Sequence, residues 1–245
     1  AIGLAQTVRN AAPSDTSVLR TLAGAYKQRG DVLALTGDKT GALADAEAAA
    51  DLYGQIAGRG DATLEDKTAS GVVSIKLGDL LGNPNFENLG RTDDAMAAYR
   101  QALDSFRRLD QANASSLSVR RFLGVTLERI GTMQAAAKQW SDAAASYQES
   151  FEIRRGLAER EPTHRDIQRD LGIAHEKLAE VLLARGDAAG AVGEQRLALA
   201  VYERLASADP ADANAGRTVA IGRENVADAL RQTGKVTEAL DLYRK

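Results

Sequence analysis

GRTDDAMAAYRQALDSF, residues 90–106, is one of five related phrases in this chain of 245 residues. The others are GDKTGALADAEAAADLY at 37–53, KQWSDAAASYQESFEI at 138–153, GDAAGAVGEQRLALAVY at 186–202 and GKVTEALDLYRK at 234–245. An alanine stands at the same place in each phrase and anchors the alignment: Ala42, Ala95, Ala143, Ala191 and Ala239. The spacings between successive anchors are 53, 48, 48 and 48. Such equal intervals indicate an internal repeat, which decides the architecture.

Small residues recur at two fixed distances before the anchors, once five extra residues are allowed for in the second repeat. The column nineteen residues before the anchor holds Ala23, Gly71, Gly124, Gly172 and Ala220. The column twelve residues before it holds Gly30, Gly78, Gly131, Ala179 and Ala227. The extra residues lie in Gly82–Asn88, a run of turn-forming residues that we expect to form a surface loop. Small residues at fixed positions allow two helices to pack closely.

Apolar residues between these positions recur at spacings of three and four, which predicts helices. The four prolines, Pro13, Pro84, Pro162 and Pro210, all fall between the predicted helices, where proline is tolerated. Gly186-Asp187 and Gly234-Lys235 separate the two helices of a pair, and Thr163 with Asp166 is expected to cap a helix start. Each repeat is therefore predicted to be a helical hairpin that buries its apolar face by stacking on its neighbours.

Composition agrees with an all-α fold. Hydrophobic residues make up 44% of the chain, aromatic residues only 4%, and 46 residues are alanine. Alanine favours helices over strands. A formal charge of −3 gives no sign of nucleic-acid binding. No apolar run is long enough to span a membrane, and the absence of cysteine excludes disulfides, thiolate metal sites and a cysteine nucleophile.

The pattern resembles the tetratricopeptide repeat. That repeat has a Leu-Gly pair in its first helix, and then alanine, an aromatic residue, alanine and proline through its second helix. The counterparts of the pair here are Leu77-Gly78, Ile130-Gly131, Leu178-Ala179 and Val226-Ala227. The aromatic residue is Tyr99, Tyr147 or Tyr243, and the later small residue is Ala49, Ala102, Ser150 or Ala198. Ala46 and Gln195 replace the aromatic residue, and Arg29 replaces the leucine, which weakens those repeats.

The predicted repeat, with its spacing of 48, is longer than the usual unit of about 34 residues. Long repeats of this kind resemble the tandem arrays that are appended to some bacterial serine/threonine kinases, and LGDLLGNPNFENLGRTDDAMAAYRQAL at 77–103 carries that resemblance. The chain itself has no kinase motif. The resemblance therefore implies an array from a larger bacterial signalling protein.

The resemblance implies a right-handed α-solenoid of stacked antiparallel hairpins along residues 1–245. We expect residues 1–13 to be the tail of a preceding repeat, with Leu4 and Val8 in its apolar positions. Both ends of the sequence are expected to be cut from a longer array. The predicted repeats are 14–60, 61–113 with the insertion at 82–88, 114–161, 162–209 and a truncated one at 210–245.

Catalytic and metal-binding readings find little support in the sequence. His175 occupies a packing position, His164 lies in a turn, and Trp140 begins a second helix, where packing explains it. Two histidines without a third ligand or a nucleophile motif suggest neither a metal site nor a triad. We predict a protein that is not an enzyme and has no cofactor.

The resemblance implies that the first helices line a concave groove. Positions 22, 18, 15 and 11 before the anchors share one face, because their spacings are four, three and four. The basic column is Arg20, Thr68, Arg121, Arg169 and Arg217, and the apolar column is Gly24, Val72, Val125, Ile173 and Ile221. The two acidic columns are Lys27, Ile75, Glu128, Glu176 and Glu224, then Asp31, Asp79, Thr132, Glu180 and Asp228. They are either solvated charges that pair between neighbouring helices or one exposed binding surface.

The binding surface that we predict is this set: Arg121, Arg169, Arg217, Val125, Ile173, Ile221, Glu128, Glu176, Glu180, Glu224, Asp228, Asp31 and Asp79. Exposed apolar rows usually mark an interaction, so the favoured function is a scaffold that binds a peptide or a partner domain. We expect the charges to be exposed and to contribute little to folding. The alternative is self-association through exposed terminal helices. The partner is a protein rather than nucleic acid or a membrane, and the compartment is not predicted.

Overall fold

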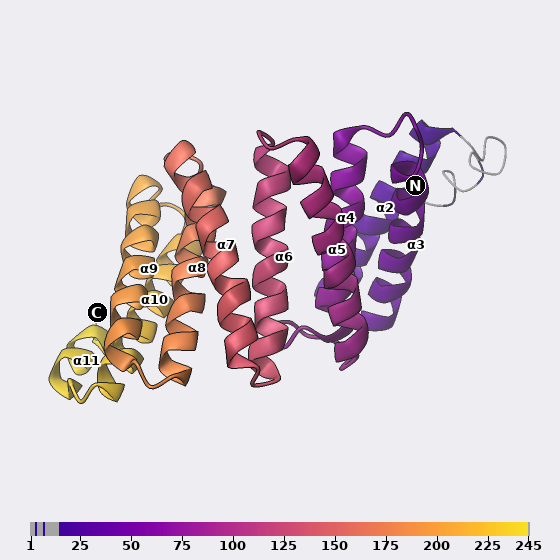
Figure 1. The fold of residues 1–245 in the computed structure, drawn as a ribbon. Helices are drawn as coiled ribbons and strands as arrows, with labels where there is room; N and C mark the ends of the chain where they lie inside the picture. Colours follow the sequence, from indigo (N-terminus) through magenta and orange to yellow (C-terminus); the bar gives the residue numbers. More distant parts are fainter. Residues whose placement is uncertain (1–2, 4–6, 8–14, 245) are drawn as a thin grey trace. The chain divides into compact units, whose positions relative to one another are not determined.

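The computed structural model describes residues 3, 7 and 15–244 of the chain (Figure 1). Over these residues it contains ten helices and no strand, so the all-α prediction is confirmed. The helices are α2 (Thr16–Leu35), α3 (Lys39–Ala57), α4 (Leu64–Gly82), α5 (Thr92–Ala112), α6 (Leu117–Ala136), α7 (Trp140–Arg160), α8 (Arg165–Ala184), α9 (Ala188–Ala208), α10 (Ala213–Gln232) and α11 (Val236–Tyr243). The predicted tail at 1–13, with Leu4, Val8 and Pro13, lies outside the described residues except for positions 3 and 7.

Helices of the same kind begin at regular intervals. Helices α5, α7, α9 and α11 begin at Thr92, Trp140, Ala188 and Val236, which repeats the anchor spacing of 48. Helices α6, α8 and α10 begin at Leu117, Arg165 and Ala213, with the same spacing. The step from the start of α4 to the start of α6 is five residues longer, because the loop between α4 and α5 is longer than its counterparts.

The chain divides into two compact units, one up to Met133 and one from Gln134 onward. In the N-terminal unit, α2 packs on α3, α3 on α4 and α4 on α5. In the C-terminal unit, α7 packs on α8, α8 on α9, α9 on α10 and α10 on α11. From α2 to α5 and from α7 to α11, each helix therefore packs on the next one along the chain (Figure 1).

Side-chain caps and left-handed turn residues set the helix ends. The side chains of Asp15, Asp38, Asp187 and Asp212 each accept a hydrogen bond from backbone N–H groups in the first turn of the helix that follows. A capping box forms between Thr63 and Asp66. The predicted cap at Thr163 is wrong: the N-cap of α8 is His164, and its side chain makes no capping bond.

The turn inside each hairpin has a positive φ at one fixed position, five residues before the anchor alanine. Glycine supplies it at Gly37, Gly90, Gly186 and Gly234, and Lys138 supplies it in the turn before α7, with φ 60°. Glycine reaches this conformation without a Cβ clash, which explains its recurrence at this position.

At glycines in the two small-residue columns, aromatic rings of the paired helix pack directly against the backbone. A Cβ on Gly71 would lie 2.6 Å from the Phe106 ring, and one on Gly78 would lie 2.4 Å from the Tyr99 ring. In the C-terminal unit, a Cβ on Gly172 would lie 2.4 Å from the Tyr202 ring. These distances are too short for any side chain, so the glycines are steric requirements of the hairpins.

The loop between α4 and α5 differs in part from the surface loop that we predicted. Pro84–Glu87 is exposed, but Asn83 is completely buried. The Asn83 side chain donates a 2.8 Å hydrogen bond to the Tyr99 hydroxyl, and Leu89 N–H donates to the carbonyl of Leu80 at 3.0 Å. The loop is therefore fastened to the hairpin at both ends.

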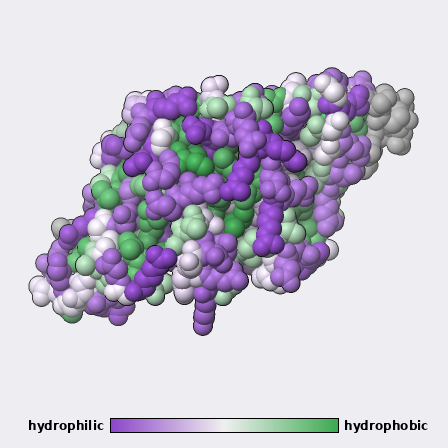
Figure 2. All heavy atoms as spheres, viewed as in Figure 1, coloured by the Kyte–Doolittle hydropathy of each residue, from purple (hydrophilic) through white to green (hydrophobic). Residues whose placement is uncertain are grey.

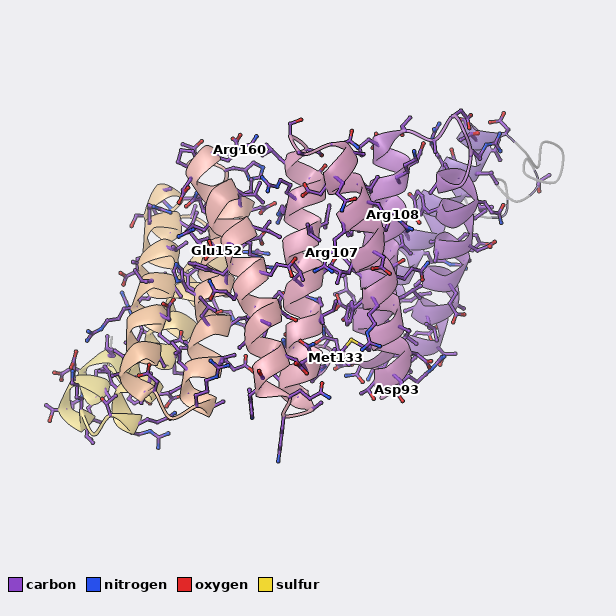
Figure 3. All side chains as sticks on the ribbon, viewed as in Figure 1. Asp93, Arg107, Arg108, Met133, Glu152 and Arg160 are labelled. Atoms are coloured by element: carbon purple, nitrogen blue, oxygen red, sulfur yellow. The ribbon has the colours of Figure 1, made fainter. Side chains whose placement is uncertain are left out.

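Much of the surface seen in Figure 2 is hydrophilic, with hydrophobic residues showing in patches between charged ones. The second helices present charged residues to solvent, among them Arg107 and Arg108 on α5 and Glu152 and Arg160 on α7 (Figure 3). Within residues 15–244, no helix is both long enough and apolar enough to cross a lipid bilayer.

Candidate functional site

Ion pairs link neighbouring first helices of the N-terminal unit. Lys76 on α4 pairs with Asp31 on α2, and Arg129 Nε on α6 lies 2.9 Å from Asp79 Oδ1 on α4. The two cations stand at the same repeat position: Lys76 lies three residues before Asp79, and Arg129 lies three residues before Thr132, the equivalent position in α6. The predicted acidic residues Asp31 and Asp79 thus serve helix–helix contacts, as in the alternative of pairing between neighbouring helices.

Arg20 and Asp66 make a further link between α2 and α4. Arg20 Nε and Nη2 each donate to a carboxylate oxygen of Asp66 at 2.6 Å. These hydrogen bonds hold the pKa of the Asp66 carboxyl well below its usual range, although desolvation opposes the shift. The carboxylate is buried and also completes the capping box, so Arg20 of the predicted basic column has a structural partner.

Asp79 lies at the centre of a polar network. Its Oδ1 accepts hydrogen bonds from Tyr99 Oη at 2.5 Å, Arg129 Nε at 2.9 Å and Asn83 Nδ2 at 3.2 Å. Burial raises the pKa of the Asp79 carboxyl, and the neighbouring Arg129 charge opposes that shift. Burial and the Asp79 charge also raise the pKa of Tyr99, so its phenol remains protonated as a donor.

Four positions on the predicted face of the N-terminal unit are buried rather than exposed. They are Thr68, Ile75, Glu128 and Thr132. Glu128 Oε2 pairs with Arg129 Nη1 at 2.6 Å, and Glu128 Oε1 accepts from the Thr132 hydroxyl at 3.2 Å. The expectation that Glu128 belongs to an exposed stripe is therefore wrong, because its carboxylate is used inside the helix packing. Arg121 and Val125 on α6 are half-buried.

Helix α8 of the C-terminal unit is also partly covered. Arg169 is exposed, whereas Ile173, Glu176 and Glu180 are half-buried. Glu176 accepts a 3.2 Å hydrogen bond from Asn225 Nδ2 on α10, and burial raises the pKa of the Glu176 carboxyl against a lowering hydrogen bond from Tyr202. Glu180 pairs with Lys177 at 3.0 Å. Glu176 is thus a packing residue, in contrast to the dispensable surface charge that we predicted.

Helix α10 presents all four predicted residues to solvent: Arg217, Ile221, Glu224 and Asp228. Ile221 is 45% exposed and lies between the exposed Arg217 and Glu224. Arg217, Ile221 and Glu224 line one side of a pocket of about 280 Å³, and Leu242 and Tyr243 of α11 line the other. The Tyr243 hydroxyl donates to Asp228 Oδ1 at 2.6 Å.

The histidines and the tryptophan have structural surroundings. His175 Nδ1 lies 2.7 Å from Glu194 Oε2, and its ring meets the Phe151 ring edge-on with centroids 5.1 Å apart. Trp140 packs against the buried cluster around Tyr147 and Val181. Among the residues that the structure describes, no group of three histidine, cysteine or acidic side chains is placed to hold a metal ion.

Comparisons with known proteins identify the fold. No protein-family model matches the chain, and no curated protein sequence matches it significantly. The crystal structure of BtubC (BKLC) from P. vanneervenii has a TM-score of 0.70 at 16% identity over 99% of this chain and 84% of its own. The apo form of RapI has a TM-score of 0.60 at 11% identity over 98% of this chain and 56% of its own. A putative kinesin light chain from P. anserina, with nearly identical TPR-like repeats, has a TM-score of 0.53 at 12% identity over 94% of this chain and 92% of its own.

The fold is tetratricopeptide-like. Stacked helical hairpins and these three structures support that assignment together. At such low identities the likeness extends to the fold alone, and it transfers no partner or binding residue to this chain.

Sequence reasoning missed three features of the tetratricopeptide-like face. One is the set of tyrosine–carboxylate hydrogen bonds, for which the spacing of fifteen residues between Asp228 and Tyr243 was an available signal. The second is the pair of Arg20 with Asp66. The third is a pocket beside Ala46. The sequence shows that Ala46 replaces the aromatic residue of the repeat, but this replacement indicates only a weaker repeat and not an open space.

Proposed function

We propose that this chain is a non-catalytic scaffold that binds a segment of a partner protein on the first-helix face of its C-terminal unit. The observation that supports this most strongly is the exposure of Ile221, at 45%, between the exposed Arg217 and Glu224 on α10. Ile221 lines one pocket with Leu242 and the exposed Tyr243, and a contiguous apolar patch with a polar rim is typical of an interaction surface. The half-buried Ile173 on α8 occupies the equivalent position one repeat earlier.

The charges on this face favour a segment with charges of both signs. Arg169 and Arg217 are exposed at one end of α8 and α10, and Glu224 and Asp228 are exposed further along α10. A bound segment would place acidic side chains against the arginines, an apolar side chain on Ile221, and basic side chains against the carboxylates. Charge complementarity of this kind acts mainly on specificity and association rate, and it weakens with salt.

We propose in addition that the 48-residue interval is the building unit of the array and that the array belongs to a larger bacterial signalling protein. The equal spacing of helix starts supports the first statement. The second rests on the resemblance of residues 77–103 to kinase-associated arrays. Mass-spectrometric identification of the full-length product in the source cells would test it.

A matched pair of substitutions tests the binding face. Ile221→Lys places a charge on the proposed contact, and Leu197→Lys places the same charge on α9, where Leu197 is 51% exposed. We expect the first variant to lose the proteins that the parent retains from a lysate of the source organism, and the second to retain them. Direct titration with the purified partner should then show at least tenfold weaker binding for Ile221→Lys alone. Equal retention by both variants, with parent-like melting curves, would contradict this face as the site.

Self-association is a second candidate because α11 exposes three large apolar residues. Val236 is 52% exposed, Leu240 is 46% exposed and Tyr243 is 45% exposed. A second copy that packed on this helix would cover them. Light scattering over a range of concentrations separates the two functions, because self-association raises the measured mass in the absence of any partner.

A further inference from the structure

The first hairpin has a pocket where the second hairpin has a tyrosine ring. Ala46 and Tyr99 stand at the same repeat position, four residues after the anchors Ala42 and Ala95. Three surrounding positions correspond: Gly30 matches Gly78, Asp31 matches Asp79, and Lys76 matches Arg129, whereas Leu35 stands at the position of Asn83. Both positions belong to the N-terminal unit, so the two can be compared directly.

In the second hairpin, the ring is enclosed and its hydroxyl is fully used. Tyr99 has no exposed surface, and its ring lies against Gly78. The hydroxyl donates to Asp79 at 2.5 Å and accepts from Asn83 at 2.8 Å. The Asp79 carboxylate is balanced by Arg129 at 2.9 Å. This position is a complete binding site for a phenol, occupied by the chain's own side chain.

In the first hairpin, a carboxylate and a cation at the positions of Asp79 and Arg129, namely Asp31 and Lys76, line a pocket of about 200 Å³. Ala42, Ala46 and Ala49 of α3 form its floor, and Val73 of α4 forms a wall. At Gly30 the paired helices approach so closely that a Cβ would lie 3.2 Å from Asp45 Cβ. Besides α2 and α3, the pocket is lined by Val73, Lys76, Asp79 and Leu80 of α4.

The pocket has a charged but balanced rim. Asp31 pairs with Lys76 and lies 3.7 Å from Lys27 Nζ, and Asp79 also lines the pocket. Because Asp79 also pairs with Arg129, both carboxylates and both ammonium groups of this rim already have partners of opposite charge. They do offer acceptors and donors to one neutral hydroxyl group, in the arrangement that Asp79 and Arg129 have around Tyr99.

The pocket adjoins a groove that is lined by both apolar and acidic residues. A second cavity of about 710 Å³ shares Asp31, Ala34 and Leu80 with the pocket and is bounded by Leu35 and Phe86. Leu35 is 88% exposed, and Phe86 is 43% exposed with the Arg129 guanidinium 4.8 Å from its ring centroid. A chain that enters the pocket would therefore rest its neighbouring side chains on these two residues.

We propose that this pocket binds a tyrosine side chain of a partner protein, with an aliphatic neighbour of that tyrosine against Leu35 and Phe86. The ring replaces the aromatic side chain that Ala46 lacks, and the hydroxyl donates to Asp31. This inference deepens the proposed scaffold function by naming the chemistry of a second contact, on a unit different from the one that holds the α10 face.

The test uses p-cresol, which reproduces the tyrosine side chain, with toluene as the probe that lacks the hydroxyl. Titration of the isotope-labelled protein, followed by NMR, should give saturable shifts at Ala42, Ala46 and Val73. We expect p-cresol to bind at least about tenfold more tightly than toluene, the ratio that one hydrogen bond to a charged carboxylate supplies. Asp31→Leu should remove this preference while leaving toluene binding in place.

Two substitutions to tyrosine provide the control. Ala46→Tyr supplies the ring from within the chain and should abolish the shifts while raising the melting temperature. Ala97→Tyr adds the same side chain at an exposed position of α5 and should leave p-cresol binding unchanged. Absence of saturable shifts in the parent, or binding that survives in a folded Ala46→Tyr variant, would overturn the proposal. Neither outcome depends on Ile221, so the scaffold function can fail or hold independently.

Discussion

The hairpins α2–α3 and α4–α5 follow the same spacing but are held together by different contacts. In α4–α5, the rings of Phe106 and Tyr99 occupy the space left by Gly71 and Gly78. In α2–α3, the buried cluster is aliphatic, with the partly buried Tyr26 and Tyr53 packed against it, and a bidentate pair between Arg29 and Asp45 at 2.6 Å also joins the two helices. The repeat spacing therefore fixes where two helices meet but leaves open which side chains join them.

This difference determines what each hairpin can bind. The buried rings of α4–α5 fill the space between its helices and α6, where Phe106 stacks on Phe122, so little of that space remains for a ligand. The alanines of α2–α3 leave a pocket of comparable position. A substitution that weakens a repeat as a folding unit thus creates a place for an outside side chain. Gln195 replaces the aromatic residue in α9 and is buried, so a missing ring does not always leave a pocket.

The largest expected contrast lies between two glycine substitutions. Gly78→Ala places a methyl group 2.4 Å from the Tyr99 ring, whereas Gly30→Ala places one 3.2 Å from Asp45 Cβ. We expect Gly78→Ala to lower the free energy of unfolding by about 2–3 kcal/mol through overpacking. Gly30→Ala should change it by less than about 1 kcal/mol, because the gain in helix propensity offsets a milder contact.

Urea denaturation of both variants and the parent checks this contrast. The slope of the unfolding free energy against urea concentration should be the same for all three proteins, so that the urea concentrations at the midpoints report the differences in stability. An equal decrease in the free energy of unfolding of the two variants would mean that the two hairpins pack alike at these glycines, contrary to the expected contrast.

A second contrast concerns two aspartates of α4 with opposite pKa shifts. The pKa of Asp66 is lowered by Arg20, so its ionised form stabilises the fold, and this contribution is lost as the pH falls below the usual aspartate value of about 4. The pKa of Asp79 is raised by burial, so its stabilising contribution is present at low pH and declines as the pH rises above that value. At neutral pH, Asp66→Asn should cost about 2 kcal/mol, as for hydrogen bonds to a charged group.

Denaturation at several pH values distinguishes the two aspartates. The stability difference between parent and Asp66→Asn should narrow toward acid pH. The difference between parent and Asp79→Asn should instead narrow toward neutral pH. Parallel curves for the two variants would show that the environments of the two carboxylates do not differ in this way.

The sequence predicted the hairpin architecture because small residues and turn glycines must stand where backbones nearly touch, and those positions repeat. It also placed Ile221 and its charged neighbours correctly on an exposed helix face. It failed at Glu128 and Glu176, because a helical spacing defines a face but does not say which other side chains reach it. Arg129, the next residue on α6 itself, reaches Glu128, and Asn225 of α10 reaches Glu176. Neither residue belongs to the four columns of the predicted face.

The smallest expected effect concerns the loop that distinguishes the second hairpin from the others. Removing five residues, Asn83–Glu87, would restore the interval of the other repeats, and the sequence alone predicts little cost because loop length contributes weakly to stability. Within this segment the structure buries Asn83, whose side-chain amide donates to Tyr99 Oη at 2.8 Å and to Asp79 Oδ1 at 3.2 Å. Asn83→Ala should therefore destabilise the protein by about 1–2 kcal/mol, because the buried partners lose a donor.

Asn85→Ala is the matched control for this prediction. Asn85 lies two residues further along the same loop and is exposed, so its side chain should contribute less than about 0.5 kcal/mol. Thermal melting of both variants, followed by the far-UV helical signal, measures the difference. A similar small decrease in stability for both variants would show that the loop contributes nothing specific to the packing of the second hairpin. A loss restricted to Asn83→Ala would show that the second hairpin uses its insertion to complete the surroundings of Tyr99, which the first hairpin, with Ala46, does not need.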